Sequence, residues 1–161
     1  MIDLGWAAPE RRLDAGSARE RILAQHSRIR DLLQRAHAVA EAALDGRPPS
    51  PEAVASSIGD IRATMEVHLA FEEKTLLPLL RDDLPLGPVR ADRLLDEHRR
   101  QRQSLATLHG EARSFPDFPI LAAKLSFLVA WLLADMAEEE KSLLNPDVVR
   151  DDVVNIDQSS G

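Results

Sequence analysis

Residues 68–78, HLAFEEKTLLP, decide the fold, because they place a histidine and a glutamate within a run of apolar residues at helical spacing. His68 and Glu72 are separated by one helical turn, so their side chains share one face of a helix. A related stretch, DMAEEEKSLLNP, occupies residues 135–146, with Asp135 one turn before Glu139. Both stretches end at a proline. The chain therefore looks like one helical hairpin followed by a second copy of it.

Capping residues and prolines set the other expected helix boundaries. Ser17 begins a capping box with Glu20, Ser50 is placed to cap a helix that starts at Pro51, and Pro88 opens the third helix. The expected helices cover residues 17–45, 51–80, 88–114 and 119–145. No stretch alternates with the period of a strand. These features predict an all-α fold, an antiparallel up-down-up-down four-helix bundle over residues 17–146, with irregular extensions at 1–16 and 147–161.

Composition excludes several classes of protein. The chain has 161 residues and no cysteine, so disulfides, thiolate metal sites and cysteine nucleophiles are absent. The net charge is -7 and no basic block is present, so we expect neither nucleic acid nor a membrane as a partner. The most apolar segment, residues 120–136, is interrupted by Lys124 and Asp135 and falls short of a clean membrane span. The start shows no signal peptide, and a cytoplasmic location is expected.

Several potential metal ligands are expected at one level of the bundle. Counted from one end at about 1.5 Å per residue, they lie at depths of roughly 9 to 18 Å on four different helices. Apolar neighbours favour an inward orientation, and buried carboxylates without partners would be costly. A bound cation removes that cost. Imidazole and carboxylate ligands without sulfur suit iron, manganese or zinc, and their number favours a di-metal site. The six candidate ligands are His26, His68, Glu72, His98, Asp135 and Glu139.

In order and spacing, these residues resemble the hemerythrin-like (HHE cation-binding) domain family. The resemblance covers roughly residues 17–146. It implies two iron ions in a non-haem, oxo- or hydroxo-bridged centre that interacts with O2 or a related small oxidant. By the same resemblance His26, His68 and His98 would be terminal ligands. Glu72 and Glu139 would bridge the metals, with Glu140 as a competitor for the second bridging role.

Two positions depart from the family pattern. Asp135 stands where the family usually has histidine, and Arg102 stands where oxygen-carrying members have a second histidine on the third helix. Asp135 can still bind metal as a harder, anionic donor. Arg102 cannot, and we expect it to lean out of the bundle or pair with a carboxylate. The oxygen-rich ligand set should stabilise ferric iron, which favours irreversible oxidation over release of O2.

The expected role is therefore sensing, scavenging or iron handling, with oxidoreductase chemistry if the protein is an enzyme. Two alternatives stay open: a bundle without metal that serves as an interaction module, and a structural zinc or manganese site. His37 and His109 fall outside the expected level and are assigned no role. Glu73 and Glu138 are expected on solvated helix faces. Glu97 and His98 could form a simple surface pair.

Overall fold

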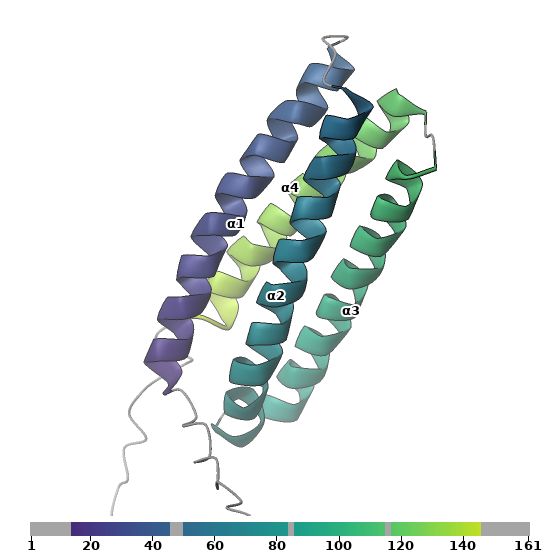
Figure 1. Cartoon of the computed structure of the whole chain (residues 1–161). Helices are drawn as coiled ribbons and strands as arrows, with labels where there is room; N and C mark the ends of the chain where they lie inside the picture. The colour runs from purple at the N-terminus through teal and green to yellow at the C-terminus, as the bar shows by residue number, and fades with distance from the viewer. Residues whose placement is uncertain (1–13, 46–49, 84–85, 115–116, 146–161) are drawn as a thin grey trace, which may run out of the picture.

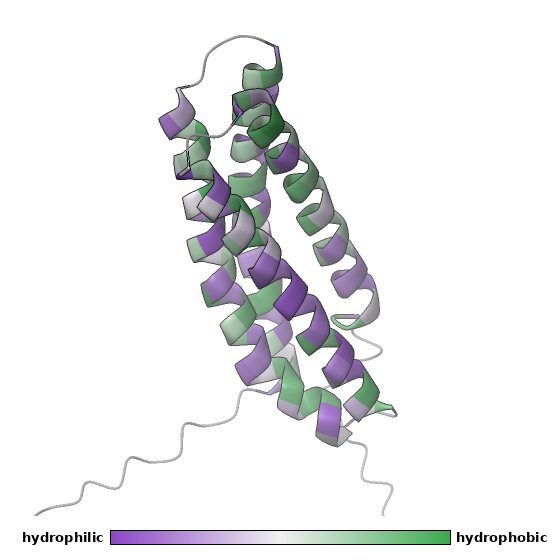
Figure 2. Ribbon diagram, turned by 90° about the vertical axis from the view of Figure 1, so that its right-hand side faces the viewer, coloured by the Kyte–Doolittle hydropathy of each residue, from purple (hydrophilic) through white to green (hydrophobic). Residues whose placement is uncertain are grey.

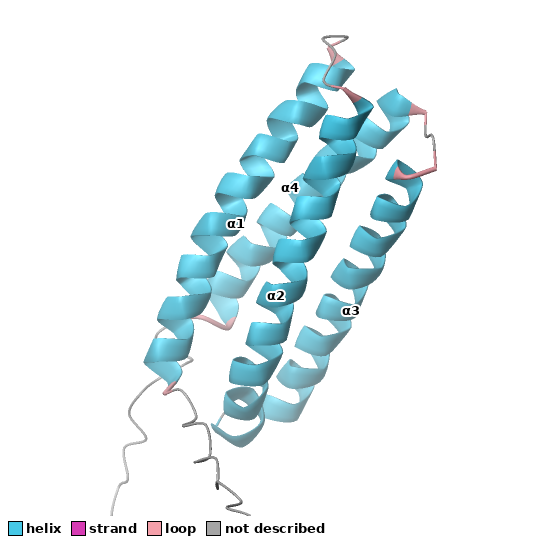
Figure 3. Cartoon of the chain, viewed as in Figure 1, coloured by secondary structure: helices cyan, strands magenta, loops and turns pink. Residues whose placement is uncertain are grey.

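The computed structural model describes residues 14–45, 50–83, 86–114 and 117–145, and within them every regular element is an α-helix. Of the expected extensions at 1–16 and 147–161, only residues 14–16 lie within these ranges. The helices are α1 (Ala15–Leu44), α2 (Pro51–Asp83), α3 (Gly87–Ala112) and α4 (Phe118–Ser142). They run alternately up and down as one bundle, which confirms the predicted fold (Figures 1 and 3).

Helix α1 begins two residues earlier than the sequence predicted. Asp14, not Ser17, is the N-cap, and its Oδ1 accepts a hydrogen bond of 2.8 Å from the backbone N–H of Ser17. A carboxylate at this position satisfies an otherwise unpaired N–H and complements the positive end of the helix dipole. The Ser17 hydroxyl instead donates to Asp14 Oδ2. The predicted cap at Ser50 is confirmed, because its hydroxyl accepts from the N–H of Ala53.

The turn between α2 and α3 depends on a glycine. Helix α2 continues through Pro78 to Asp83, beyond the predicted end near residue 80, and α3 starts at Gly87. Leu86, just before it, adopts a left-handed conformation with a φ of 60°. A Cβ atom on Gly87 would lie 1.9 Å from the backbone oxygen of Leu80. The two helices therefore approach each other too closely for any side chain at this position.

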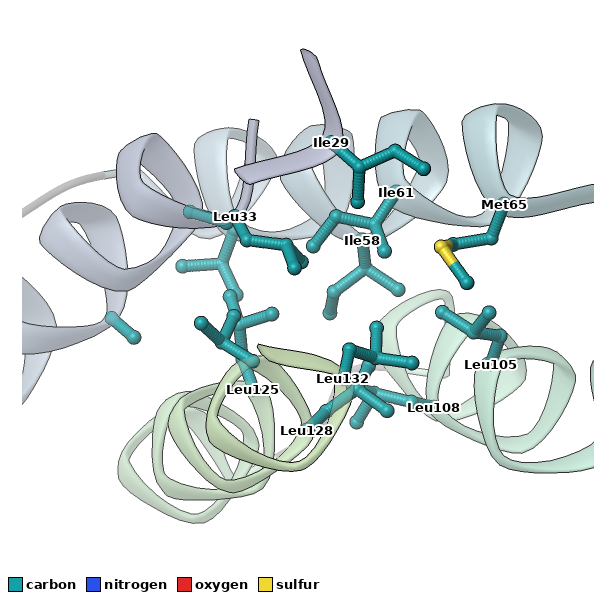
Figure 4. Packing of buried hydrophobic residues seen from close by; sticks show 14 of the residues in the cluster. Ile29, Leu33, Ile58, Ile61, Met65, Leu105, Leu108, Leu125, Leu128 and Leu132 are labelled. Atoms are coloured by element: carbon teal, nitrogen blue, oxygen red, sulfur yellow. The ribbon is translucent and has the colours of Figure 1, made fainter. Parts of the chain in front are cut away.

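Two apolar clusters fill the inside of the bundle, and their buried residues come from all four helices. The larger one includes Ile29, Leu33, Ile61, Leu105 and Leu132 (Figure 4). The smaller one consists of Ile22, Leu76, Leu80, Ala91, Leu94 and Leu144. On α1, α2 and α3, the buried polar residues His26, Glu72 and His98 lie between the two clusters. On α4, Glu139 lies between Met136 of the larger cluster and Leu144, which follows the end of the helix, in the smaller one. A polar level thus separates the two apolar clusters.

Helix α4 is the most apolar of the four helices. Polar and apolar residues alternate around the helices in Figure 2, as expected for a bundle with one inward stripe on each. Among the described helices, α4 alone is long enough and apolar enough to cross a membrane. By this criterion of length and composition, the prediction that residues 120–136 fall short of a membrane span was too strict. Core helices share this composition, and α4 packs Leu125, Leu128 and Leu132 into the larger cluster. This property is weak evidence for a membrane segment.

Candidate metal centre

The polar level contains three histidines from three helices around one glutamate. His26 on α1, His68 on α2 and His98 on α3 are 0 to 3% exposed, and Glu72 on α2 is 0% exposed. Glu72 Oε1 lies 3.0 Å from His68 Nε2 and 3.4 Å from His26 Nε2. Its other oxygen, Oε2, lies 3.1 Å from His98 Nε2. All three imidazoles therefore turn the same nitrogen toward one carboxylate.

Helix α4 adds a second carboxylate to this group. Glu139 Oε2 lies 3.7 Å from His26 Nε2, and the Glu139 side chain is 15% exposed. Four residues each offer one ligand atom, and these four atoms all lie within 4.8 Å of one another: His26, His68, Glu72 and Glu139. Such a set is compact enough to surround one metal ion.

The outward nitrogen of each imidazole is held by a hydrogen-bond partner. This arrangement fixes the ring and its tautomer, so that the inward Nε2 is presented as a ligand, and it is typical of histidines that bind metal. The three pairs are His26 Nδ1 with Glu140 Oε1 at 2.9 Å, His68 Nδ1 with Gln25 Oε1 at 2.8 Å, and His98 Nδ1 with Glu73 Oε1 at 2.9 Å.

Two arginines support the carboxylates of these pairs from the outside. Arg30 lies 2.8 Å from Glu140 Oε2, and Arg102 donates to Glu73 Oε1 at 2.6 Å. Each imidazole on α1 and α3 thus belongs to a chain of arginine, carboxylate and histidine. Because these chains approach from outside the polar level, they orient the rings without filling the space between them.

Several buried atoms at the centre have no hydrogen-bond partner among the described residues. They are His26 Nε2, both oxygens of Glu72, and Glu139 Oε1. Leaving buried polar atoms unpaired is costly, and native proteins avoid it unless an ion or a water satisfies them. A cation held between the imidazole nitrogens and the carboxylate oxygens would satisfy all four atoms at once. The residues present therefore fit a metal ion.

The two central carboxylates have opposite pKa shifts. Burial alone would raise the pKa of Glu72, but His26, His68 and His98 outweigh burial and hold this pKa well below its usual value. Burial raises the pKa of Glu139 well above its usual value, and the negative charge of Glu72 raises it further. Without a cation, Glu72 is therefore the more acidic carboxyl of the pair and Glu139 the less acidic one.

A cavity of about 280 Å³ reaches the centre from the side where α3 faces α4. It is lined by the buried His68, Glu72 and His98 and by Glu139, and also by the more exposed Arg90 and Arg93 of α3. Small molecules can therefore approach the polar level between these two helices.

Comparison with known families agrees with this geometry. The sequence model of the hemerythrin HHE cation-binding domain family matches residues 17–145 of the chain. The protein belongs to this family. No curated protein and no solved structure matches it.

Within this hemerythrin domain, five of the six predicted ligands lie at the centre. Four of them form the compact set, and His98, outside that set, contacts Glu72 Oε2. The sixth, Asp135, also lies outside the set and lines the cavity. Its Oδ2 accepts a hydrogen bond of 2.7 Å from Gln101 Nε2, across the boundary between α3 and α4. Burial and contact with Glu97 raise the pKa of Asp135 to about 6. Its role as a ligand stays a prediction.

Other expectations are resolved by the direction of single side chains. Arg102 pairs with Glu73 and Glu66, as expected, and stays out of the centre. Glu140 points to the outer nitrogen of His26, which leaves Glu139 as the inward glutamate of α4. The expectation for Glu73 was wrong in part, because its side chain holds His98 rather than only meeting solvent.

The remaining histidines lie away from the hemerythrin centre. His37 faces the Ser126 hydroxyl at 3.4 Å on the surface, and His109 contacts Arg62. Sequence reasoning missed Gln25 and Gln101. Gln101 follows His98 by three residues and therefore shares its helix face, which is a signal that could have found it. Gln25 directly precedes His26 and carries no such signal.

Proposed function

We propose that this hemerythrin domain binds iron, with room for two ions, and reacts with O2 or a related small oxidant. The observation that carries the proposal is the division of Glu72, whose Oε1 faces His26 and His68 while Oε2 faces His98. A carboxylate that offers one oxygen to each of two histidine groups is suited to bridge two metal ions. The family match and the unpaired buried atoms support binding of a cation at this place.

The residues have distinct roles in this proposal. His26, His68 and Glu139 would hold one ion with Glu72 Oε1, and His98 would hold the other with Glu72 Oε2. Imidazole and carboxylate donors without sulfur are compatible with iron. Bound iron would supply redox chemistry toward O2 or peroxide at an open coordination position. The cavity between α3 and α4 would admit the oxidant, and the apolar clusters on both sides limit access of water.

The biological role that we infer is sensing, scavenging or iron handling rather than reversible oxygen transport. With Glu72, Glu139 and the nearby Asp135, the centre has more carboxylates than we expect in a reversible oxygen carrier. Anionic donors favour ferric iron. The cytoplasmic location and the absence of nucleic-acid and membrane partners stay predictions from the sequence.

The proposal is tested on the purified full chain. Iron, manganese and zinc are measured per chain, and the near-ultraviolet and visible spectrum is recorded after anaerobic loading with Fe²⁺ and exposure to air. We expect iron to bind and to oxidise without releasing O2. Stable, reversible oxygenation would contradict the inferred role. A folded chain that takes up no metal would support the alternative, a hemerythrin fold that serves as an interaction module.

A pair of variants ties metal uptake to the centre. Glu72→Gln removes the charge of the central carboxylate with little change in its shape, so uptake should fall sharply. His37→Ala removes a surface histidine and should leave uptake unchanged. Circular dichroism of both variants shows whether the helices are retained. Equal metal uptake by the two variants would place the metal elsewhere.

A further inference from the structure

The two sides of Glu72 carry different kinds of donor. On the side of Oε1, two imidazole nitrogens, from His26 and His68, lie within 3.4 Å of the carboxylate oxygen. On the side of Oε2, the single imidazole is His98, at 3.1 Å. On α3 and α4, the cavity beside His98 is lined by the oxygen donors Gln101 and Asp135, which lie outside the compact set of four ligands. The centre is therefore asymmetric in its chemistry.

Arg102 is one reason for this asymmetry. It follows His98 by one helical turn, where a second imidazole of α3 could face the centre. Its guanidinium is instead turned outward, to Glu73 at 2.6 Å and to Glu66 at 3.2 Å. The α3 side of the centre consequently has no further nitrogen donor from this position.

Gln101 offers an oxygen donor on the same side. Its side chain is buried, with 6% of the residue exposed, and it lines the cavity together with His98 and Asp135. The amide nitrogen donates to Asp135 Oδ2 at 2.7 Å, whereas the carbonyl oxygen Oε1 has no hydrogen-bond partner among the described residues. An unpaired buried carbonyl oxygen beside a carboxylate is an arrangement that a cation would satisfy.

Donor type determines which divalent ion a site prefers. Imidazole suits iron, zinc and other late transition metals, whereas carboxylate and carbonyl oxygens suit manganese and magnesium. Zinc also stands above manganese in the general order of affinity. A site with two imidazoles and a site with one imidazole and several oxygens should therefore differ both in affinity and in preferred ion.

We propose that the centre has two unequal metal positions. The first position, His26, His68, Glu72 Oε1 and Glu139, binds a transition metal tightly and fills first. The second position, His98, Glu72 Oε2, Asp135 and Gln101 Oε1, binds more weakly and accepts Mn²⁺ while the first position holds another metal. The chain thus forms a mixed-metal centre. This inference rests on the proposed function, because it requires that the centre binds metal.

The test uses the full chain, with its metal removed by a chelator and then titrated with Zn²⁺ by calorimetry. We expect one equivalent to bind first and a second to bind at least about tenfold more weakly, a difference of about 1.4 kcal/mol. The protein carrying one equivalent of Zn²⁺ is then titrated with Mn²⁺, and free Mn²⁺ is counted by electron paramagnetic resonance. We expect one further Mn²⁺ to bind.

Variants assign each step to its residues. Asp135→Asn and Gln101→Leu should weaken Mn²⁺ binding by about tenfold or more and leave the first Zn²⁺ step unchanged. His26→Ala should abolish the first step. Asp31→Asn removes an equal charge from the exposed face of α1 and should change neither step. Asp135→His adds an imidazole to the second position, so the two Zn²⁺ steps should move closer together, which loss of structure would not produce.

The outcomes separate this inference from the proposed function. Two equivalents of Zn²⁺ that bind with equal affinity would overturn the inference while leaving metal binding intact. Mn²⁺ binding that is unaffected by Asp135→Asn and Gln101→Leu would also overturn it. Binding of no metal at all would overturn the proposed function, and the inference with it.

Discussion

Glu72 Oε2 lies 3.1 Å from His98 Nε2, although the two residues belong to different helices and both are almost completely buried. The outer nitrogen of His98 is held by Glu73, the neighbour of Glu72 in the sequence. Adjacent residues of α2 thus contact the two ring nitrogens of one histidine on α3. The ring is fixed from both sides, and this relationship leads to the first prediction.

Glu73→Gln should weaken metal binding by about 10- to 100-fold, because loss of the charged partner of His98 Nδ1 lowers the basicity and fixed orientation of the ring. Metal affinity is measured by competition with a chromogenic chelator. Glu66→Gln is the matched control, since Glu66 contacts Arg102 at the surface and does not touch His98. An equal loss in both variants would show that surface charge, rather than support of His98, sets the affinity.

Metal loading should raise the melting temperature of the protein. A ligand that binds only the folded state at 100 times its Kd adds about 2.7 kcal/mol to the free energy of unfolding. Differential scanning calorimetry with and without Zn²⁺ measures the shift. His37→Ala should show the same shift as the wild type, and Glu72→Gln should lose most of it. A shift that survives Glu72→Gln would mean that the stabilising ion binds at another place.

Much of this centre could be predicted from the sequence, because a helix places residues one turn apart on one face. His68 and Glu72 were found in that way, and helix lengths then brought His26 and His98 to the same level, where both contact Glu72. The bundle itself followed from prolines and caps at its turns. Periodicity along single helices was sufficient for these features.

Directions of individual side chains could not be predicted in the same way. Glu139 and Glu140 are adjacent, and both lie near the inner edge of α4. The choice between them depends on Arg30 of α1, which pairs with Glu140. Asp135 shares the face of Glu139, but its shorter side chain meets Gln101 instead of the central set. Such contacts between helices have no signature in the spacing of one helix.

Gly87→Ala should destabilise the fold by several kcal/mol, because the new Cβ would meet the backbone oxygen of Leu80 at 1.9 Å and the turn between α2 and α3 would have to shift. Gly110→Ala is the matched control in the same helix. Among the described residues, no atom beyond the neighbouring backbone of the same helix lies within 4 Å of its Cβ position, so alanine should stabilise α3 by about 0.5 to 1 kcal/mol. Urea unfolding measures both effects. Equal behaviour of the two variants would contradict the close approach at Gly87.

The final prediction concerns the pH dependence of the metal-free protein. Burial and contact with Glu97 raise the pKa of Asp135 from 3.8 to about 6 in the folded state. A carboxyl group with a raised pKa favours the folded state while it is protonated. Its contribution is therefore complete below the unfolded pKa of 3.8 and is lost as the pH rises through about 6.

Asparagine at position 135 keeps a neutral side chain at every pH and should be free of this loss. The melting temperature of Asp135→Asn should therefore rise relative to that of the wild type as the pH increases from 4 to 7. Asp31→Asn, on the exposed face of α1, should follow the wild type throughout. Thermal unfolding in the presence of a chelator measures the three proteins. A constant difference between Asp135→Asn and the wild type across this range would contradict a raised pKa at Asp135, because only a group that gains charge between pH 4 and pH 7 produces a difference that grows.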